Sequence, residues 1–118
     1  KGTKYPIDFN LIKKNSNYFY ERQDQYINIQ DIELAEGLIN ISEDSIPSFI
    51  SSCHNDSFEI NESNVFSLYQ LSIKYEVPYL NSLTDDFIKN NDKALIFQSI
   101  QYKCQLMEIQ ISFLFRRS

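Results

Sequence analysis

Two adjacent residues, Cys53 and His54, are the first candidates for chemistry, because a thiol beside an imidazole is the pairing of a cysteine nucleophile with its base. Adjacent side chains on a helix point about 100° apart, which is poor geometry for such a pair. His54 is the only histidine, and neither Cys53 nor Cys104 has a second Cys or His at ligand spacing. The sequence therefore predicts a buried thiol followed by a helix-end histidine, with no metal site and no disulfide framework.

Two carboxylate pairs, Glu43-Asp44 and Asp85-Asp86, could in principle act as general acid and base. Each pair is expected at a helix start or on a polar face, where solvated charge is the normal explanation. Gly2 and Gly37 are the only glycines, so a glycine-rich phosphate loop is excluded. We therefore expect no enzyme activity and no cofactor; catalysis would need a group supplied from outside these residues.

The composition predicts one largely helical domain. The 118 residues are enough for a single hydrophobic core, and 42% of them are hydrophobic. The net charge of −5 argues against nucleic acid as a partner, since binding to a phosphate backbone depends on many Lys and Arg side chains. No apolar run is long enough to span a bilayer, and no secretory signal is present, so we expect no membrane partner. The isolated cysteines suit a reducing cytoplasm or nucleus.

A pair of helices is predicted between residues 65 and 88, where the sequence has its clearest periodicity. Asn61 or Ser63 can cap the first helix, and Glu62 lies where the helix dipole favours a carboxylate. Pro78 should end the first helix just upstream and start the second. The predicted inner faces carry Val65, Leu68, Tyr69, Ser72 and Ile73, then Leu80, Leu83, Thr84 and Phe87, while Gln70 and Lys74 are predicted to face solvent.

The first half of the chain mixes short strands with helices. An edge strand is expected at 5–7, a strand or extended loop at 27–32, and a strand at 37–41. Asp8 can cap one helix, whose inner side carries Phe9, Ile12, Ser16 and Phe19 or Tyr20. Ser45 opens another helix, with Pro47 in its first turn. Its inner residues are predicted to be Ile46, Phe49, Ile50 and Cys53.

Three segments, in this order, carry a resemblance to a known family. Segment 5–19 is similar to a signature in which an aromatic residue and a histidine precede a helix ending Leu-x-x-x-Ser-x-x-Phe. Segment 45–49, Ser-Ile-Pro-Ser-Phe, resembles a cap followed by a close variant of Pro-x-x-Phe, with one residue between Pro47 and Phe49. Segment 74–80, Lys-Tyr-Glu-Val-Pro-Tyr-Leu, matches Lys-Tyr-x-Val-x-x-Leu. The family is BTB/POZ. The chain departs from it at Asp8, where the family has His, and at 53–57, where the family has a Tyr-Thr-Gly turn.

The resemblance implies an α+β fold, predominantly helical, in which a helical cluster is flanked by a small β-sheet. It implies a BTB/POZ-like domain at 1–92 whose first strand, upstream of Gly2, is missing. Residues 93–118 would then be a helical extension that leads into a further region, such as ankyrin repeats. The function that the resemblance implies is protein–protein interaction, by homo-oligomerisation as a homodimer and by recruitment of a protein partner.

Tyr18, Tyr20 and Tyr26 are the candidate dimer-interface residues. All three lie in or just after the first predicted helix, and not all of them can face one core. In the family this helix helps to form a two-fold interface, and tyrosine is favoured at interfaces because its ring buries much area while its hydroxyl stays paired. A purely structural role for the three rings is equally compatible with their spacing.

Three functional hypotheses stay open at this point. The chain is an oligomerisation module of a longer protein, or a substrate adaptor that docks a cullin scaffold of a ubiquitin ligase. The altered segment 53–57 lies near the cullin contacts of family adaptors, which favours the first hypothesis. The third is a helical scaffold unrelated to BTB, which would require an internal sequence period that the chain does not show.

Overall fold

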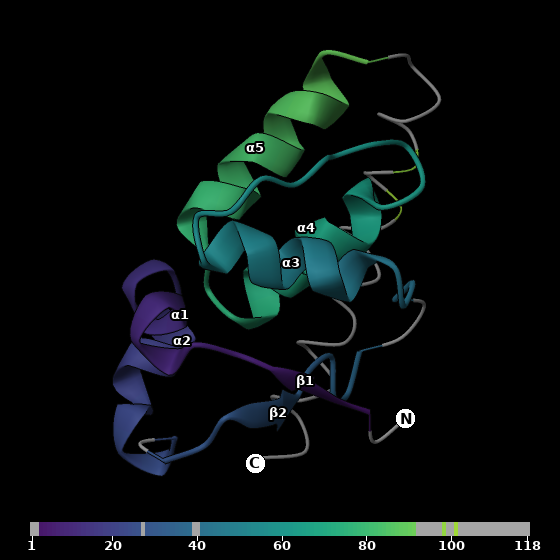
Figure 1. Ribbon diagram of the computed structural model, residues 1–118. Helices are drawn as coiled ribbons and strands as arrows, with labels where there is room; N and C mark the ends of the chain where they lie inside the picture. The colour runs from purple at the N-terminus through teal and green to yellow at the C-terminus, as the bar shows by residue number, and fades with distance from the viewer. Residues whose placement is uncertain (1–2, 27, 39–40, 92–97, 99–100, 102–118) are drawn as a thin grey trace, which may run out of the picture.

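The computed structural model describes residues 3–26, 28–38, 41–91, 98 and 101 (Figure 1). Helices form most of the fold, and a small antiparallel sheet lies beside them, so the predicted α+β, predominantly helical class is confirmed. In chain order the elements are β1 (Lys4–Pro6), α1 (Phe9–Asn15), α2 (Asn17–Glu21), the 3-10 turn η1 (Gln23–Gln25), β2 (Asp31–Glu33), α3 (Ser45–Cys53), α4 (Val65–Lys74) and α5 (Pro78–Lys89).

The sheet pairs β1 with β2, and Tyr5 lies opposite Ile32 at its centre. Ile32 is buried while its neighbours Asp31 and Glu33 are exposed, the alternation expected of a strand with one covered face. Strand β1 begins and ends one residue before the predicted range 5–7. Strand β2 is shorter than the predicted 27–32 stretch and extends beyond it by one residue.

The predicted strand at 37–41 is wrong for those of its residues that the structure describes. Gly37 has a φ of 81°, and the backbone N–H of Leu38 donates to the carbonyl of Ala35, so the chain turns here. Ile41 is not in a strand either, and residues 39 and 40 lie outside the described ranges. Alternation of polar and apolar residues was the only signal for this strand, and a turn centred on a positive-φ glycine overrides it.

The single helix predicted after Asp8 is in fact two helices that meet at Ser16. The carboxylate of Asp8 accepts from the backbone N–H of Asn10, as predicted for a cap. Ser16 ends α1 with extended backbone angles and then caps α2, because its hydroxyl oxygen accepts from the N–H of Phe19. The break lets Ile12 and Phe19 both reach the core from differently directed helices.

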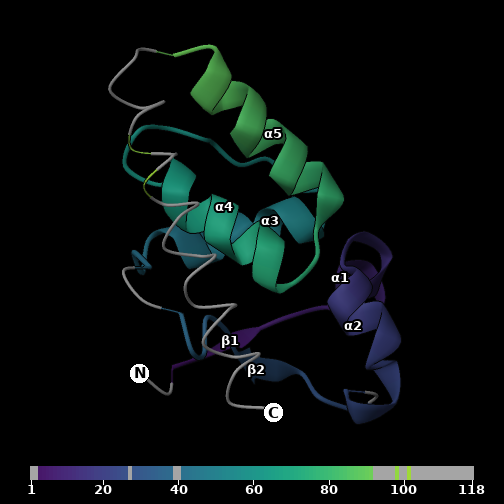
Figure 2. The ribbon, with the colours of Figure 1, turned by 180° about the vertical axis from the view of Figure 1, so that it is seen from behind.

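Helix α4 is the centre of the fold, and it packs against both α3 and α5 (Figures 1 and 2). The predicted stripe is buried at Val65, Leu68, Tyr69 and Ser72, and Ile73 is half-buried. Gln70 was predicted to face solvent, and this is wrong, since only 3% of it is exposed. A helix with neighbours on more than one side also buries residues outside its apolar stripe. The prediction assumed one buried face and one exposed face, and so it placed Gln70 in solvent.

Helices α3 and α4 end in the same way, with a residue of positive φ just past the helix. After α3 this residue is Asn55 (φ 61°), and after α4 it is Glu76 (φ 52°). In each case two backbone hydrogen bonds close the turn. After α3 the N–H of Asp56 donates to the carbonyl of Ser51, and the N–H of Asn55 donates to that of Ser52. After α4 the N–H of Val77 donates to the carbonyl of Ser72, and the N–H of Glu76 donates to that of Ile73. This is the Schellman motif, which usually carries glycine.

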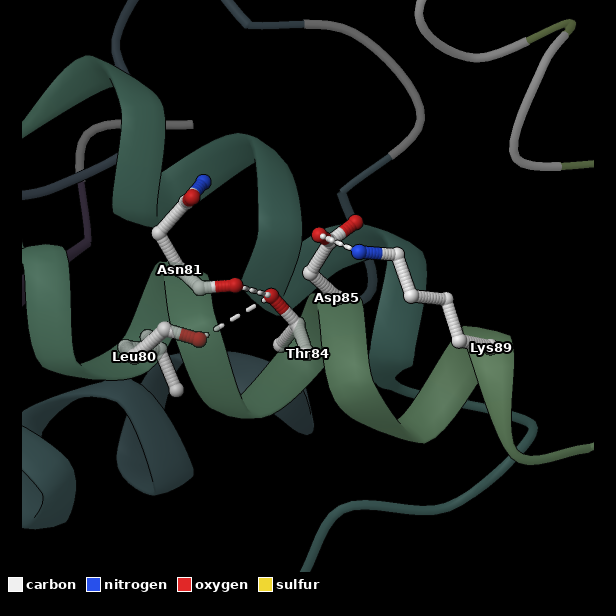
Figure 3. Close-up of polar contacts among 5 residues, drawn as sticks. All are labelled: Leu80, Asn81, Thr84, Asp85 and Lys89. Atoms are coloured by element: carbon white, nitrogen blue, oxygen red, sulfur yellow. Dashed lines mark hydrogen bonds and ion pairs between the residues drawn. The ribbon is translucent and has the colours of Figure 1, made fainter.

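Pro78 begins α5 at the first helical position, as predicted. The face of α5 against the core is formed by Leu80, Thr84 and Ile88. Leu83 and Phe87, predicted on that face, are half-buried at its edge. Thr84 is buried, and its hydroxyl is hydrogen-bonded there: it donates to the carbonyls of Leu80 and Asn81, each at 3.0 Å (Figure 3).

The predicted boundary near residue 92 and the extension at 93–118 lie outside the described ranges, except for residues 98 and 101. Within the part of the chain that the structure describes, no helix has the length and apolar character needed to cross a membrane.

Candidate interaction surface

The candidate surface is carried by α2, and backbone contacts fix this helix to the corner between α4 and α5. The hydroxyl of Ser16 donates to the backbone carbonyl of Tyr75, and the N–H of Asn17 donates to the carbonyl of Glu76 at 3.0 Å. Both figures of the ribbon show this corner beside α1 and α2. A solvent-facing side chain of α2 therefore projects from a helix that is held in a fixed position.

An aromatic cluster packs on the inner side of α2. Phe19 and Tyr75 are its centre: their rings stack with centroids 5.3 Å apart, and the hydroxyl of Tyr75 accepts from the backbone N–H of Ala35 at 2.9 Å. Burial raises the pKa of Tyr75, so its hydroxyl keeps its proton further into alkaline solution than an exposed tyrosine would. The members of the cluster are Phe9, Tyr18, Phe19, Tyr26, Phe49 and Tyr75.

Tyr18, one of the predicted interface residues, belongs to this cluster. Its ring lies edge-on to those of Phe19 and Tyr75, with centroids 5.1 and 5.2 Å apart. The guanidinium carbon of Arg22 lies 3.9 Å from the centre of the Tyr18 ring, a cation–π contact. The half-buried Tyr18 ring is thus covered by Arg22 on one side and held by two rings on the other.

Tyr26, the second predicted interface residue, is also half-buried in the cluster. It stacks on Phe9 with centroids 5.8 Å apart and meets Phe19 edge-on at 5.2 Å. Burial, followed by the neighbouring Tyr18 hydroxyl, raises the pKa of Tyr26. These contacts give Tyr26 a place in the packing of its own chain.

Tyr20, the third predicted residue, points to solvent, and 58% of it is exposed. Tyr79, in the first turn of α5, is 52% exposed and follows the same corner to which α2 is bound. With Ile29, these are the large apolar side chains most exposed in the described ranges. Tyr79 was missed by sequence reasoning, although its place off the predicted inner stripe of α5 was a usable signal. The structure therefore leaves Tyr20 exposed on α2 and Tyr79 exposed on α5, the helix that follows the corner bound by Asn17, and it draws Tyr18 and Tyr26 inward.

The residues first considered for chemistry are held by structural contacts. Cys53 is fully buried, and burial raises the pKa of its thiol to about 12, so it is protonated at neutral pH. His54 Nε2 accepts from the backbone N–H of Asp8 at 3.3 Å and so links the end of α3 to the start of α1. Asp85 forms an ion pair with Lys89 at 3.1 Å along one face of α5 (Figure 3).

The described surface has clefts beside the sheet's connections to α1 and α3. One, of about 690 Å³, lies between the start of α1 and the loop before β2, with polar and charged residues such as Asp8, Lys13 and Asp31 in its lining. Another, of about 450 Å³, lies between the sheet and the start of α3. Among the described residues, no three His, Cys, Asp or Glu side chains come close enough together to hold a metal ion.

Comparison of the chain with family models, with curated proteins and with solved structures gives no match.

Proposed function

We propose that this chain is a protein–protein interaction module that pairs copies of a longer protein through the exposed tyrosines of α2 and α5, as a BTB/POZ-like domain. The observation that carries the proposal is the 58% exposure of Tyr20 on a helix whose backbone is anchored to the core by Ser16 and Asn17. A large amphipathic ring on a rigid support loses little side-chain entropy on binding, which is why tyrosine is enriched at interfaces.

The order of the three family-like segments supports the BTB/POZ part of the proposal. Asp8, where the family has His, caps α1. Asn55 supplies the positive φ after α3 in a segment where the family has a glycine turn. Both departures are thus compatible with the family's local geometry. We place the protein in the cytoplasm or nucleus, where a buried reduced thiol such as Cys53 is normal.

A cullin adaptor is the second candidate function. It rests on the resemblance alone, and segment 53–57, near which family adaptors contact the cullin, differs here in sequence. The oligomerisation module is therefore the function we put first.

Light scattering at several protein concentrations tests both candidates. We expect the native chain to form a dimer and the Tyr20→Ser/Tyr79→Ser double variant to become monomeric at the same concentrations. Lys14→Ser, an exposed change on α1, serves as the matched control and should leave the mass unchanged. A native chain that is monomeric throughout would contradict the proposal. A second series with a purified cullin N-terminal region should show no added mass if oligomerisation is the function.

A further inference from the structure

The cleft between the sheet and α3 combines an apolar floor with an acidic rim. Its volume is about 450 Å³, and it is enclosed by β1, the end of β2, the following turn and the start of α3. Its lining includes the apolar side chains of Leu34, Leu38, Ile41 and Ile46 and the carboxylates of Glu36 and Glu43. We call this the acidic cleft.

The floor of the acidic cleft is part of the protein's own core. Leu34 and Ile46 are only 5% and 6% exposed and belong to the main hydrophobic cluster. Tyr5, Leu38 and Ile41 are half-buried against the same cluster and leave part of their apolar surface open. An apolar side chain that enters the cleft would remove this surface from water, which favours binding.

The rim carries Glu33, Glu36 and Glu43, all of them exposed. No Lys, Arg or His is among the described residues that line the cleft. Two cations lie near its edge. Lys4 is opposite Glu33 in the sheet, and the ammonium group of Lys74, whose pKa burial lowers, is attracted by Glu36, which partly offsets that lowering. The rim therefore keeps an excess of negative charge toward solvent.

Gly37 leaves the mouth of the cleft open. A Cβ atom added at this glycine would meet no atom within 4 Å, so an approaching backbone would find no side chain in its way here. Its positive φ also turns the chain between Glu36 and Leu38. Glu36 and Leu38, on either side of this turn, both line the cleft.

From this geometry we propose that the acidic cleft binds an extended segment of a partner protein in which apolar side chains alternate with arginines. The apolar side chains would lie on Leu38 and Ile41, and the guanidinium groups would pair with Glu36 and Glu43, an arrangement in which arginine can donate two parallel hydrogen bonds to one carboxylate. This goes beyond the proposed self-association, because the cleft is formed by other elements than those that carry Tyr20 and Tyr79.

Fluorescence anisotropy with the full chain and a labelled peptide Leu-Arg-Phe-Arg-Leu-Arg tests the proposal. We expect binding that the Glu36→Gln/Glu43→Gln double variant weakens by about fivefold or more, as the loss of two partly screened ion pairs implies. The matched control is Asp56→Asn/Glu62→Gln, which removes the same net charge at exposed positions that do not line the cleft. Ile41→Ser, with its fold checked by circular dichroism, should weaken binding comparably. A peptide with Glu in place of Arg should not bind.

Three outcomes would overturn the proposal: no binding of the arginine peptide, equal weakening by both double variants, or a change in the mass of the protein alone when Glu36 and Glu43 are altered. Equal weakening would mean only general attraction to an acidic protein, and a change in mass would make the cleft an interface between copies. The Tyr20→Ser/Tyr79→Ser variant separates this proposal from the previous one, since it should bind the peptide as the native chain does.

Discussion

The hydroxyl of Ser16 donates a hydrogen bond to the backbone carbonyl of Tyr75, a residue 59 positions further along the chain. The same hydroxyl oxygen accepts from the N–H of Phe19, so one side chain caps α2 and also fixes it to the end of α4. Ser16 is 1% exposed, and no solvent can replace it in either bond. This buried hydroxyl therefore acts together with the Asn17 N–H, which donates to the carbonyl of Glu76, to fix the position of the tyrosine-bearing helix.

Replacement of Ser16 by alanine is expected to lower the free energy of unfolding by about 1–3 kcal/mol, because it removes a helix cap and leaves a buried carbonyl without its donor. Urea unfolding followed by circular dichroism measures the change. Ser57→Ala, an exposed serine in a loop, is the control and should stay within about 0.5 kcal/mol of the native chain. Equal stability of the two variants would refute the role given to Ser16.

Tyr26 and Tyr20 are expected to respond differently to truncation. Tyr26→Ala should cost about 2 kcal/mol of stability, because it removes a half-buried ring that contacts Phe9 and Phe19. Tyr20→Ala should cost less than about 0.5 kcal/mol, as for a surface change. Both are measured by urea unfolding at a concentration where light scattering shows only monomers. A larger loss for Tyr20 than for Tyr26 would contradict the division between core and surface.

Several elements of the fold follow from local chemistry in the sequence. Asp8 accepts a backbone N–H at the start of α1, and Pro78 occupies the first position of α5. The third helix begins at Ser45 with Pro47 in its first turn. Each of these helix starts follows from the preference of one residue type for one backbone position, and tertiary packing does not change it.

Other elements depend on contacts that no local pattern contains. Ser16 breaks the first helix because its hydroxyl reaches Tyr75, far away in the chain, and Gln70 is buried because α4 has neighbours on several sides. For the candidate surface, the three tyrosines were identifiable from their spacing. The distinction between the inward Tyr18 and Tyr26 and the outward Tyr20 depends on Phe9, Phe19 and Tyr75, which come together only in the folded chain.

Glu76 occupies a position that favours glycine, and this makes a stabilising substitution predictable. Its φ of 52° is strained for a residue with a Cβ, whereas Glu76→Gly removes the strain and keeps the backbone carbonyl that accepts from Asn17. We expect a gain of about 0.5–1 kcal/mol in the free energy of unfolding. The matched control is Asn55→Gly at the equivalent position after α3, where asparagine already tolerates this conformation, and the gain should be smaller. A loss of stability in Glu76→Gly would show that the side chain contributes more than its strain costs.

Cys53 should make the stability of the protein fall in alkaline solution. Burial raises the pKa of its thiol from 9.0 to about 12, so between these values the unfolded chain has released the proton that the folded chain keeps. The unfolded state then binds fewer protons, and the free energy of unfolding decreases as pH rises through this window, by about 1 kcal/mol one pH unit above the lower value. The raised pKa values of Tyr26 and Tyr75 add a decrease in the same direction above pH 10.

Urea midpoints at pH 7, 9 and 10 measure this effect, and Cys53→Ala should remove most of the fall between pH 9 and 10 while it lowers stability at pH 7 through lost packing. Ile50→Val, a half-buried change on the same helix, also lowers stability at pH 7 but should keep the native pH dependence. If Cys53→Ala and Ile50→Val show the same slope, the thiol is not the group that titrates on unfolding. If the dependence of the urea midpoint on pH is lost only in Cys53→Ala, the Cys53 thiol is shielded from water at the end of α3. The packing of α1 against α3 requires this shielding.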